Sequence, residues 1–471
     1  MIHVRWNQIV SRLRTLRSEK DGLARRFFVA GAWNLLGNGV SQVIALAAQI
    51  AVVHLLGKSS FGELAAVYST LLTLGVFCGM GMGLTATKFI AELRESDPDR
   101  TCRIIAFSVR ITLAASVLMV LCVASFSGWV AEDILADARL APHLRTGALL
   151  ISLSAWNALQ ISILSGFEAF KKVAALNLLK ALISFPVLVL GARWGGVQGV
   201  IVGYLVIGAG FCAAASQMIR REASARGIKL GGTGAMEEGR MLLRFSLPAF
   251  VISLLWPLSL WSVNLLILRL PGGYEKLAVL AAARQWQAAC NFIPVALNSA
   301  VMPILTSVLS NQPSDRERSL RYVNLMSSLA ILPVTLLLAC AAPVLMRLYG
   351  ESYRDGWPIL LVLVGATGVN LLNSPAGSLI LAKGRLHATV VNTIVTSVAV
   401  TSILALVIDQ SELLGVVYVT LGANLLSTIG IVYYSMRTLG LPDSIGKNII
   451  VNAILLAGFT VALHLGYRTF L

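Results

Sequence analysis

The sequence predicts an all-α polytopic membrane protein, built as two six-helix bundles related by a pseudo-twofold axis, with a further C-terminal helix. Two observations carry this prediction: the composition, and a set of landmarks that recurs about 215 residues later in the chain. Of the 471 residues, 57% are hydrophobic and only 13% are charged, whereas an ordinary soluble domain is about a quarter charged. Apolar runs, each near or above the ~20 residues that span a bilayer, follow one another along the chain.

The apolar runs divide the chain into thirteen expected membrane spans. Before them, residues 1–27 form a basic segment whose apolar side chains recur at helical spacing, as in a helix lying on the inner leaflet. We expect the first bundle at 28–219, a cytoplasmic linker at 220–243, the second bundle at 244–437 and an extra transmembrane helix at 449–467. The expected spans are 28–56, 61–90, 104–130, 145–166, 174–192, 196–219, 244–268, 277–305, 322–348, 357–382, 386–408, 412–436 and 449–467.

Lysine and arginine residues are distributed unevenly between the two sets of loops. If the N-terminus is cytoplasmic, most of them fall in cytoplasmic segments, as the positive-inside rule requires. The net charge of +16 is then explained by these segments and the anionic inner leaflet, and it does not predict nucleic-acid binding. The basic N-terminal segment lacks an apolar core followed by a cleavage site, so no cleavable signal peptide is expected.

An internal repeat supports the division into two bundles. Gly57 lies 215 positions before Gly272, and Asn177 lies 215 positions before Asn392. The segments GGVQGVIVGY and ELLGVVYVTL share this offset to within one residue. Six spans per unit give both copies the same topology, so we expect an axis along the membrane normal and a cavity between the bundles.

The segment Leu55–Leu93 is the first copy of a hairpin between two spans. It holds a tight polar turn and then a long apolar run that is interrupted by Gly79, Gly81 and Gly83. Glycine weakens a helix interior, so these three residues are expected to bend the second span. The second copy of the hairpin surrounds Gly272.

Five further motifs are distinctive: LLGKSSFGELAAVYSTL, GLTATKFIAEL, LSGFEAFKKVAALNLLKAL, LMRLYGESYRDGWPILLVL and LILAKGRLHATVV. These motifs resemble the polysaccharide transporter family, the O-antigen and lipid-linked oligosaccharide flippases. The resemblance covers about 25–437 and places the chain in the multidrug/oligosaccharidyl-lipid/polysaccharide exporter superfamily. It implies twelve core helices, alternating access, and a substrate that carries a sugar repeat unit on undecaprenyl pyrophosphate.

The resemblance therefore implies a multi-pass flippase of the bacterial cytoplasmic (inner) membrane, and not an enzyme, that serves O-antigen, capsule or exopolysaccharide synthesis. Its expected partners are the undecaprenyl-pyrophosphate-linked oligosaccharide, the lipid bilayer, and a polysaccharide polymerase with chain-length machinery; no cofactor, metal or nucleic acid is expected. A cation-coupled multidrug exporter is disfavoured because no Asp or Glu lies well inside an expected span. A polysaccharide polymerase or ligase is also disfavoured, because such an enzyme would need a large outer loop and the longest expected outer loop spans only 131–144. A non-transporting membrane scaffold is a further alternative.

Charged residues at membrane depth are costly and tend to line cavities or substrate paths. Arg284 lies about eight residues inside the eighth expected span, and its planar fork would suit a pyrophosphate or an acidic sugar. The alternative is an arginine that snorkels to the outer interface or binds a backbone carbonyl. Gln287, Asn291 and Asn298 lie near the same helical face and are candidate cavity residues.

The first expected span carries a stripe of amides that includes Asn34, Asn38 and Gln42. These side chains would either offer hydrogen bonds to sugar hydroxyls or bind neighbouring helices to one another.

Three further cations lie within a turn or two of the cytoplasmic ends of their expected spans. They would either capture the pyrophosphate head group on entry or reach the membrane interface. These residues are Lys88, Arg110 and Lys180.

Overall fold

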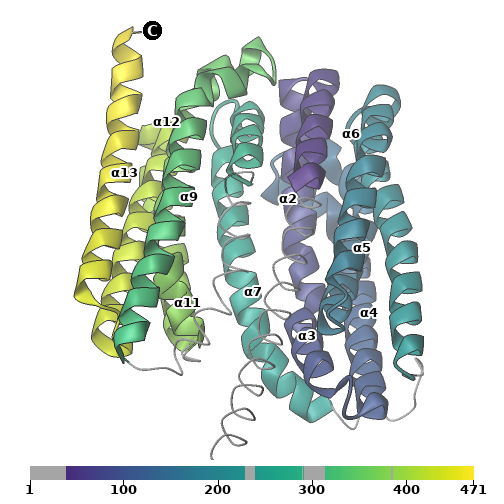
Figure 1. The fold of residues 1–471 in the computed structure, drawn as a ribbon. Coiled ribbons are helices and arrows are strands. Elements are labelled where there is room, and N and C mark those ends of the chain that lie inside the picture. The colour runs from purple at the N-terminus through teal and green to yellow at the C-terminus, as the bar shows by residue number, and fades with distance from the viewer. Residues whose placement is uncertain (1–38, 229–238, 289, 291–312, 383–385, 471) are drawn as a thin grey trace, which may run out of the picture.

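The computed structural model describes residues 39–228, 239–288, 290, 313–382 and 386–470, and all of the regular structure in them is helical. The helices run roughly along one axis (Figure 1). They are Gly39–Leu56, α2 (Lys58–Gly79), α3 (Met82–Leu93), α4 (Pro98–Trp129), η1 (Val130–Ile134), η2 (Ala138–Leu140), α5 (Ala141–Gly166), α6 (Phe170–Ala225), α7 (Gly239–Leu268), 273–288, α9 (Pro313–Arg347), η4 (Glu351–Gly356), α10 (Trp357–Leu372), α11 (Ser374–Ala382), α12 (Leu386–Leu439) and α13 (Asp443–Phe470).

Eleven helical stretches within the described residues are long and apolar enough to cross a membrane. This confirms a polytopic all-α protein. The α6 helix, counted once, covers two of the expected spans, and the expected span 277–305 lies partly outside the described residues. The number of thirteen spans therefore stays a prediction.

Apolar side chains face outward on helices whose inner faces are packed. On α4, Leu113, Val117, Leu118 and Leu121 are all at least half exposed and recur at helical spacing. A helix in water would bury such a stripe, whereas the hydrocarbon of a bilayer covers it at no cost.

The internal repeat is visible in the positions of the helices. The α4 helix begins at Pro98 and α9 begins at Pro313, an offset of 215 residues. The α6 helix begins at Phe170 and α12 begins at Leu386, an offset of 216 residues. Both hairpin glycines of the repeat have a positive φ, 77° at Gly57 and 66° at Gly272.

The second expected span, 61–90, is divided into α2 and α3. The break lies at Met80 and Gly81, which both have positive φ. Gly81 is also required by packing, because a Cβ there would lie 2.2 Å from the carbonyl oxygen of Ser246 in α7. The expected glycine bend is thus confirmed, and its cause is a backbone approach that only a residue without a side chain permits.

The α6 helix is a hairpin of two arms. It turns at Gly196, which has φ 53° and ψ −136°, a conformation outside the helical region. Next to the turn, the backbones of the two arms are in direct contact: a Cβ on Gly199 would lie 2.0 Å from the carbonyl oxygen of Gly191. The two expected spans 174–192 and 196–219 correspond to these arms.

The helices form two halves with α7 between them (Figure 1). The α2 to α6 helices pack on one another, and α9 to α13 pack around α10, whose residues are nearly all buried. The α7 helix packs on α2 and α3 of the first half and on α12 of the second. It begins at Gly239, inside the expected linker 220–243, and α6 continues to Ala225.

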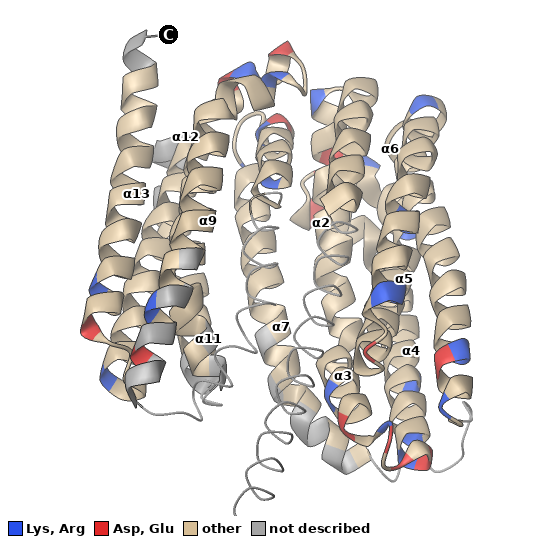
Figure 2. Cartoon of the chain, in the orientation of Figure 1, with Lys and Arg blue, Asp and Glu red and all other residues tan. Residues whose placement is uncertain are grey.

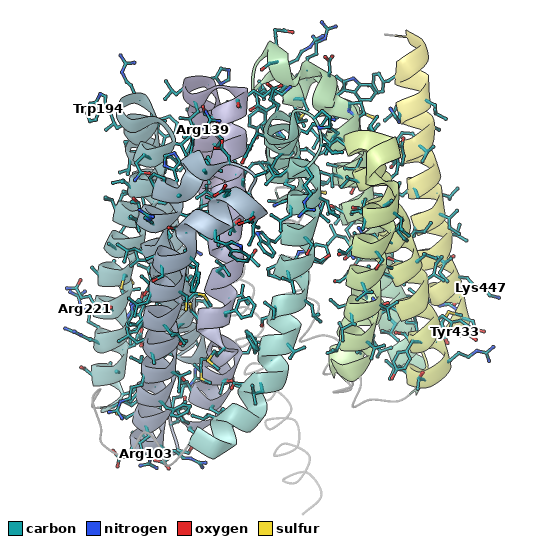
Figure 3. All side chains as sticks on the ribbon, turned by 180° about the vertical axis from the view of Figure 1, so that it is seen from behind. Arg103, Arg139, Trp194, Arg221, Tyr433 and Lys447 are labelled. Atoms are coloured by element: carbon teal, nitrogen blue, oxygen red, sulfur yellow. The ribbon has the colours of Figure 1, made fainter. Side chains whose placement is uncertain are left out.

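Charged residues gather toward the two ends of the molecule (Figure 2). We call the end that holds the turns at Gly57, Asp137 and Gly272 the hairpin end, and the opposite end, which holds Arg94 and Gly227, the linker end. Arg139 and Trp194 lie toward the hairpin end, whereas Arg103 and Arg221 lie toward the linker end (Figure 3).

Candidate functional site

The cation predicted at membrane depth is bound to the neighbouring helix. Nη1 of Arg284, in helix 273–288, donates a hydrogen bond of 2.7 Å to Oδ1 of Asn264 in α7. Arg284 lies eleven residues after Gly273, or about 16 Å along its helix. Its side chain extends toward the hairpin end, as helical side chains do when they point toward the N-terminus of their helix. The guanidinium of Arg284 meets the amide of Asn264 four residues before α7 ends at Leu268, and so does not reach the end of that helix.

The charge of Arg284 is not neutralised by this bond. Asn264 is a neutral amide, and Arg284 forms no ion pair within the described part of the chain. A guanidinium has five N–H donors, so one bond to Asn264 leaves donor capacity for an anionic ligand. Arg284 is partly exposed, whereas Asn264 is only 4% exposed. The arrangement can therefore hold an anion against a fixed cation.

Gln287 is held in the second half. Its Nε2 donates to Oγ1 of Thr367 in α10 at 2.7 Å, and that hydroxyl donates to the carbonyl of Leu363 at 2.8 Å. Gln287 therefore joins helix 273–288 to the buried centre of this half. The other two candidates on this face, Asn291 and Asn298, lie outside the described residues.

The first-span stripe is described from residue 39 onward, so Asn34 and Asn38 lie outside the described residues. Gln42 is partly exposed in helix Gly39–Leu56. About two helical turns further along, Gln49 donates to Oη of Tyr204 in α6 at 2.6 Å. The Tyr204 ring stacks on Tyr68 of α2, with 4.7 Å between centroids. This part of the stripe binds helices together within the first half.

The three cations near the linker end do not share a site with Arg284. Lys88 is exposed on α3 and lies 5.2 Å from the ring centroid of Phe89. Lys180 is exposed on α6 and lies 5.5 Å from the ring centroid of Phe211. Arg110, on α4, lines a pocket within the first half. The structure therefore separates these three candidates from the Arg284–Asn264 pair, which lies on α7 and helix 273–288.

The two halves meet at the hairpin end. A Cβ on Gly62 of α2 would lie 1.9 Å from the carbonyl oxygen of Tyr274. The hydroxyl of the same tyrosine donates to the carbonyl of Leu135 at 2.6 Å. Lys58 donates to the carbonyl of Ser352 at 2.9 Å. These three contacts connect the first half with helix 273–288 and η4.

Acidic groups surround Tyr274 at this closure. Burial raises the pKa of its hydroxyl to about 12, and the negative charges of Asp137 and Glu63 add to that shift while Arg139 opposes it. Asp137 itself has a lowered pKa, because Arg139 donates hydrogen bonds to its carboxylate. Tyr274 is therefore neutral at physiological pH and able to donate to Leu135.

Contacts at the linker end are different. Among the labelled elements, α7 packs extensively on α2 and α3 and also on α12, whereas α9 to α13 pack on none of α2 to α6 to that extent. Gly81 and Gly239 bring the start of α7 against the first half, beside Ser246 and Phe107 respectively. The halves are thus joined through several elements at the hairpin end and mainly through α7 elsewhere.

Sequence reasoning missed Asn264, Tyr274 and Gly62. Asn264 is a single amide in an apolar helix, and nothing in the sequence shows that it lies opposite Arg284. Gly62 and Tyr274 do occupy equivalent parts of the two repeat copies, five and two residues after their hairpin glycines. That position was a usable signal, because equivalent segments of a repeat often meet at its axis.

Relatives with curated names are similar to this chain over about three fifths of its length. The EPS I polysaccharide export inner membrane protein EpsE of Ralstonia nicotianae (strain ATCC BAA-1114 / GMI1000) is 25% identical over 288 residues, which is 60% of this chain and 64% of EpsE. The lipid III flippase of Escherichia coli (strain K12) is 25% identical over 311 residues, which is 61% of this chain and 70% of the flippase. The match to EpsE thus spans less than two thirds of that protein.

Two solved structures share the fold over nearly their whole length. An inward-facing multidrug resistance MATE family transporter of the MOP superfamily has a TM-score of 0.70 at 15% identity, covering 85% of this chain and 95% of the transporter. The lipid II flippase MurJ, in an inward closed conformation, has a TM-score of 0.70 at 12% identity, covering 92% of this chain and 97% of MurJ. This likeness confirms the transporter fold.

The pattern that defines the polysaccharide biosynthesis protein family matches residues 30–309, which hold the first half, α7 and the Arg284 helix. With more than half of the chain matched, the chain is a member of the polysaccharide biosynthesis protein family.

Proposed function

We propose that this protein is a flippase that moves an undecaprenyl-pyrophosphate-linked oligosaccharide across the bacterial inner membrane for O-antigen, capsule or exopolysaccharide synthesis. The observation that carries the proposal is Arg284, a cation in the expected span 277–305 that is held by a neutral amide and paired with no described carboxylate. A pyrophosphate is the anion that suits it, because guanidinium and phosphate oxygens pair with two parallel hydrogen bonds.

The distribution of acidic groups also favours an anionic substrate. Neither α7 nor residues 276–288, which carry Asn264 and Arg284, contains an aspartate or a glutamate. A transporter for cationic drugs would be expected to carry a carboxylate at depth, since a charge in the membrane is paired or functional. The relatives named for polysaccharide export and for lipid III flipping agree with this choice.

The closure at the hairpin end suggests the first step of the cycle. With the N-terminus in the cytoplasm, the hairpin end faces outward, so the described conformation is closed toward the outside by Gly62, Tyr274 and Lys58. Substrate would then enter from the linker end, with its lipid tail in the bilayer and its sugars between the halves. A polymerase and chain-length proteins would receive the product on the outer side.

A reconstitution experiment tests the proposal. The full chain is placed in liposomes with an undecaprenyl-pyrophosphate oligosaccharide that carries a dithionite-sensitive fluorophore on its sugar. Protein-dependent transfer exposes label to dithionite in the outer leaflet, beyond the half that is exposed at the start. We expect transfer by the wild type and a loss of at least about tenfold for Arg284→Ala, since a hydrogen bond to a charged group contributes about 1.5–3 kcal/mol.

The matched control is Arg269→Ala, which removes an exposed arginine from the turn just before helix 273–288. It should transfer label at the wild-type rate. The proposed function fails if the wild type moves no label while a reconstituted lipid III flippase does so in the same vesicles. Equal rates for Arg284→Ala and Arg269→Ala would remove Arg284 from the substrate site.

A further inference from the structure

The pocket that Arg110 lines lies within the first half, away from the contacts between the halves. It has a volume of about 890 Å³ and is lined by residues of α4, α5 and the second arm of α6, together with the segment that follows α6. The α4 and α6 helices both pack on α5, but they do not pack extensively on each other. The pocket is therefore a groove between α4 and α6 with α5 as its floor.

The charge of this pocket is entirely positive. Arg110 of α4 and Arg220 of α6 line it, and no lining residue is an aspartate or a glutamate. Arg110 lies twelve residues after the start of α4, or about 18 Å along it, and Arg220 lies five residues before the end of α6. Both therefore lie in the half of the molecule nearer the linker end. A pocket with two arginines and no carboxylate selects an anion.

The remaining wall is largely apolar, with a polar spot on the floor. The apolar part includes Ile105, Leu159 and Ile219. On the floor, Nε2 of Gln160 donates to Oγ of Ser216 at 2.7 Å, but its Oε1 is buried with no hydrogen-bond partner. Gln160 is only 2% exposed, so this acceptor is unsatisfied in a buried place. Nε1 of Trp156, also on the floor, is a buried donor without a partner.

We propose that this pocket binds an anionic phospholipid of the bilayer, with its phosphate at Arg110 and Arg220 and an acyl chain along the apolar wall. Basic pockets between transmembrane helices on the cytoplasmic side are suited to acidic lipid head groups. The ester and hydroxyl groups of the head group offer partners for Trp156 and Gln160. The lipid would fill the groove between α4 and α6 and so hold the first half together as a rigid body.

A bilayer phospholipid fits this pocket better than the proposed transport substrate does. All of the lining residues belong to α4, α5, α6 and the two residues 227–228 that follow α6. The pocket therefore does not lie between two halves that move apart. An oligosaccharide needs many hydrogen-bonding side chains, and most of this wall is apolar. The volume lies within the range of about 300–1,000 Å³ that is usual for small-molecule pockets, so the pocket would hold the head group and part of one acyl chain while the rest of the lipid stays in the bilayer.

Native mass spectrometry of the full chain tests the proposal. The protein is purified in mild detergent and mixed with phosphatidylglycerol or with phosphatidylcholine, which has the same acyl chains and no net charge. We expect one phosphatidylglycerol to be retained by the wild type at collision energies that remove phosphatidylcholine. The double variant Arg110→Gln/Arg220→Gln should bind phosphatidylglycerol at least about tenfold more weakly, because two charge-assisted contacts to phosphate are lost.

Two further variants separate lost binding from misfolding. Arg193→Gln/Arg221→Gln removes two exposed arginines of α6 outside the pocket, and Arg221 is the immediate neighbour of Arg220. This control should retain phosphatidylglycerol as the wild type does. Ala106→Phe keeps both pocket arginines and places a large side chain in the groove, so it should also weaken retention.

The outcomes divide clearly. Equal retention of phosphatidylglycerol by the pocket variant and the control variant would overturn the proposal. So would displacement of the retained lipid by an equimolar short-chain polyprenyl pyrophosphate, because the pocket would then be a substrate site. The readout is binding and not transfer, so a negative result in the flippase experiment leaves this test unaffected.

Discussion

The backbone of Gly62 lies directly against the carbonyl oxygen of Tyr274, so closely that a Cβ on residue 62 would stand 1.9 Å from that oxygen. The two residues belong to the corresponding hairpins of the internal repeat, five residues after Gly57 and two residues after Gly272. A methyl group cannot be accommodated by a rotamer change here, because the atom opposite is backbone. Gly62 therefore sets how closely the halves approach at the hairpin end.

The first prediction is that Gly62→Ala opens the hairpin end. Overpacking at such a contact costs about 1–3 kcal/mol, and the cost falls only on the closed conformation. Spin labels at Arg139 and Arg354, two exposed positions on opposite halves, report the separation in a background without the six native cysteines. We expect the distance distribution to move from a short toward a long population.

The matched control for this variant is Gly79→Ala, on the same helix. A Cβ at Gly79 meets nothing within 4 Å, so it should leave the distances unchanged. An unchanged distribution in Gly62→Ala would show that the α2 contact does not hold the closure.

The second prediction concerns pH. The pKa of Tyr274 is raised to about 12 by burial, with Asp137 and Glu63 adding to the shift. A raised pKa means that the folded state holds the proton more tightly. The stabilisation is therefore complete below pH ~10, the ordinary tyrosine value, and is lost as the pH rises toward 12. Below pH 10 the hydrogen bond to Leu135 should be independent of pH.

An alkaline absorbance titration of tyrosinate checks this prediction. The difference between wild type and Tyr274→Phe should show one group that titrates near pH 12. Tyr433→Phe, which changes an exposed ring on α12, should leave that late step in place. If the Tyr274→Phe difference titrates near pH 10 instead, the hydroxyl is not buried in the closure.

The third prediction concerns the turn of α6. Gly196 has φ 53° and ψ −136°, a conformation that only glycine adopts readily. Gly196→Ala should therefore destabilise the fold by about 1–3 kcal/mol, seen as a lower Tm of the purified protein. Gly195→Ala is the control, because its Cβ meets nothing within 4 Å and its φ is not positive. Equal Tm values for the two variants would mean that the hairpin tolerates another turn.

Much of the fold is predictable because membrane helices have a simple local signal. Length and hydropathy predicted a polytopic all-α protein, and eleven described helical stretches are long and apolar enough to cross a membrane. The repeat at 215 residues recurs in the starts of α4 and α9. The break between α2 and α3 was also visible as Gly79 and Gly81. The physical reason for this break was not visible in the sequence, because the carbonyl of Ser246, which leaves no room for a side chain at Gly81, lies on a helix 165 residues further along. Local sequence shows where glycine makes a helix easy to interrupt, whereas only the packing of the helices shows which contact requires the interruption.

The candidate site was less predictable. Arg284 could be found because a cation at membrane depth is rare. Its partner Asn264 depends on the register of α7 against helix 273–288, which hydropathy does not determine. Arg110 was also predicted as a cation inside an expected span, yet it lies in the first half, where it lines a pocket together with Arg220. Charge at depth therefore identified important residues without showing which of them share a site.

The last prediction tests whether the free charge of Arg284 is what the substrate uses. Asn264→Asp places a carboxylate where the amide oxygen now accepts from Nη1 at 2.7 Å. The new ion pair should keep the fold and neutralise the cation, so transfer of a pyrophosphate-linked substrate should fall at least about tenfold. Asn264→Ala removes the bond but leaves the charge, so it should lose less activity than Asn264→Asp.

A double-mutant cycle with Arg284→Gln makes this prediction specific. In that background the new carboxylate has no cation to neutralise, and Asn264→Asp should reduce transfer by no more than about twofold beyond the effect of Arg284→Gln. Transfer rates are measured by the dithionite assay, and monodispersity in gel filtration shows that each variant folds. Equal losses from Asn264→Asp in both backgrounds would mean that the carboxylate acts by general repulsion of the substrate, and Arg284 would then have no special part in binding it.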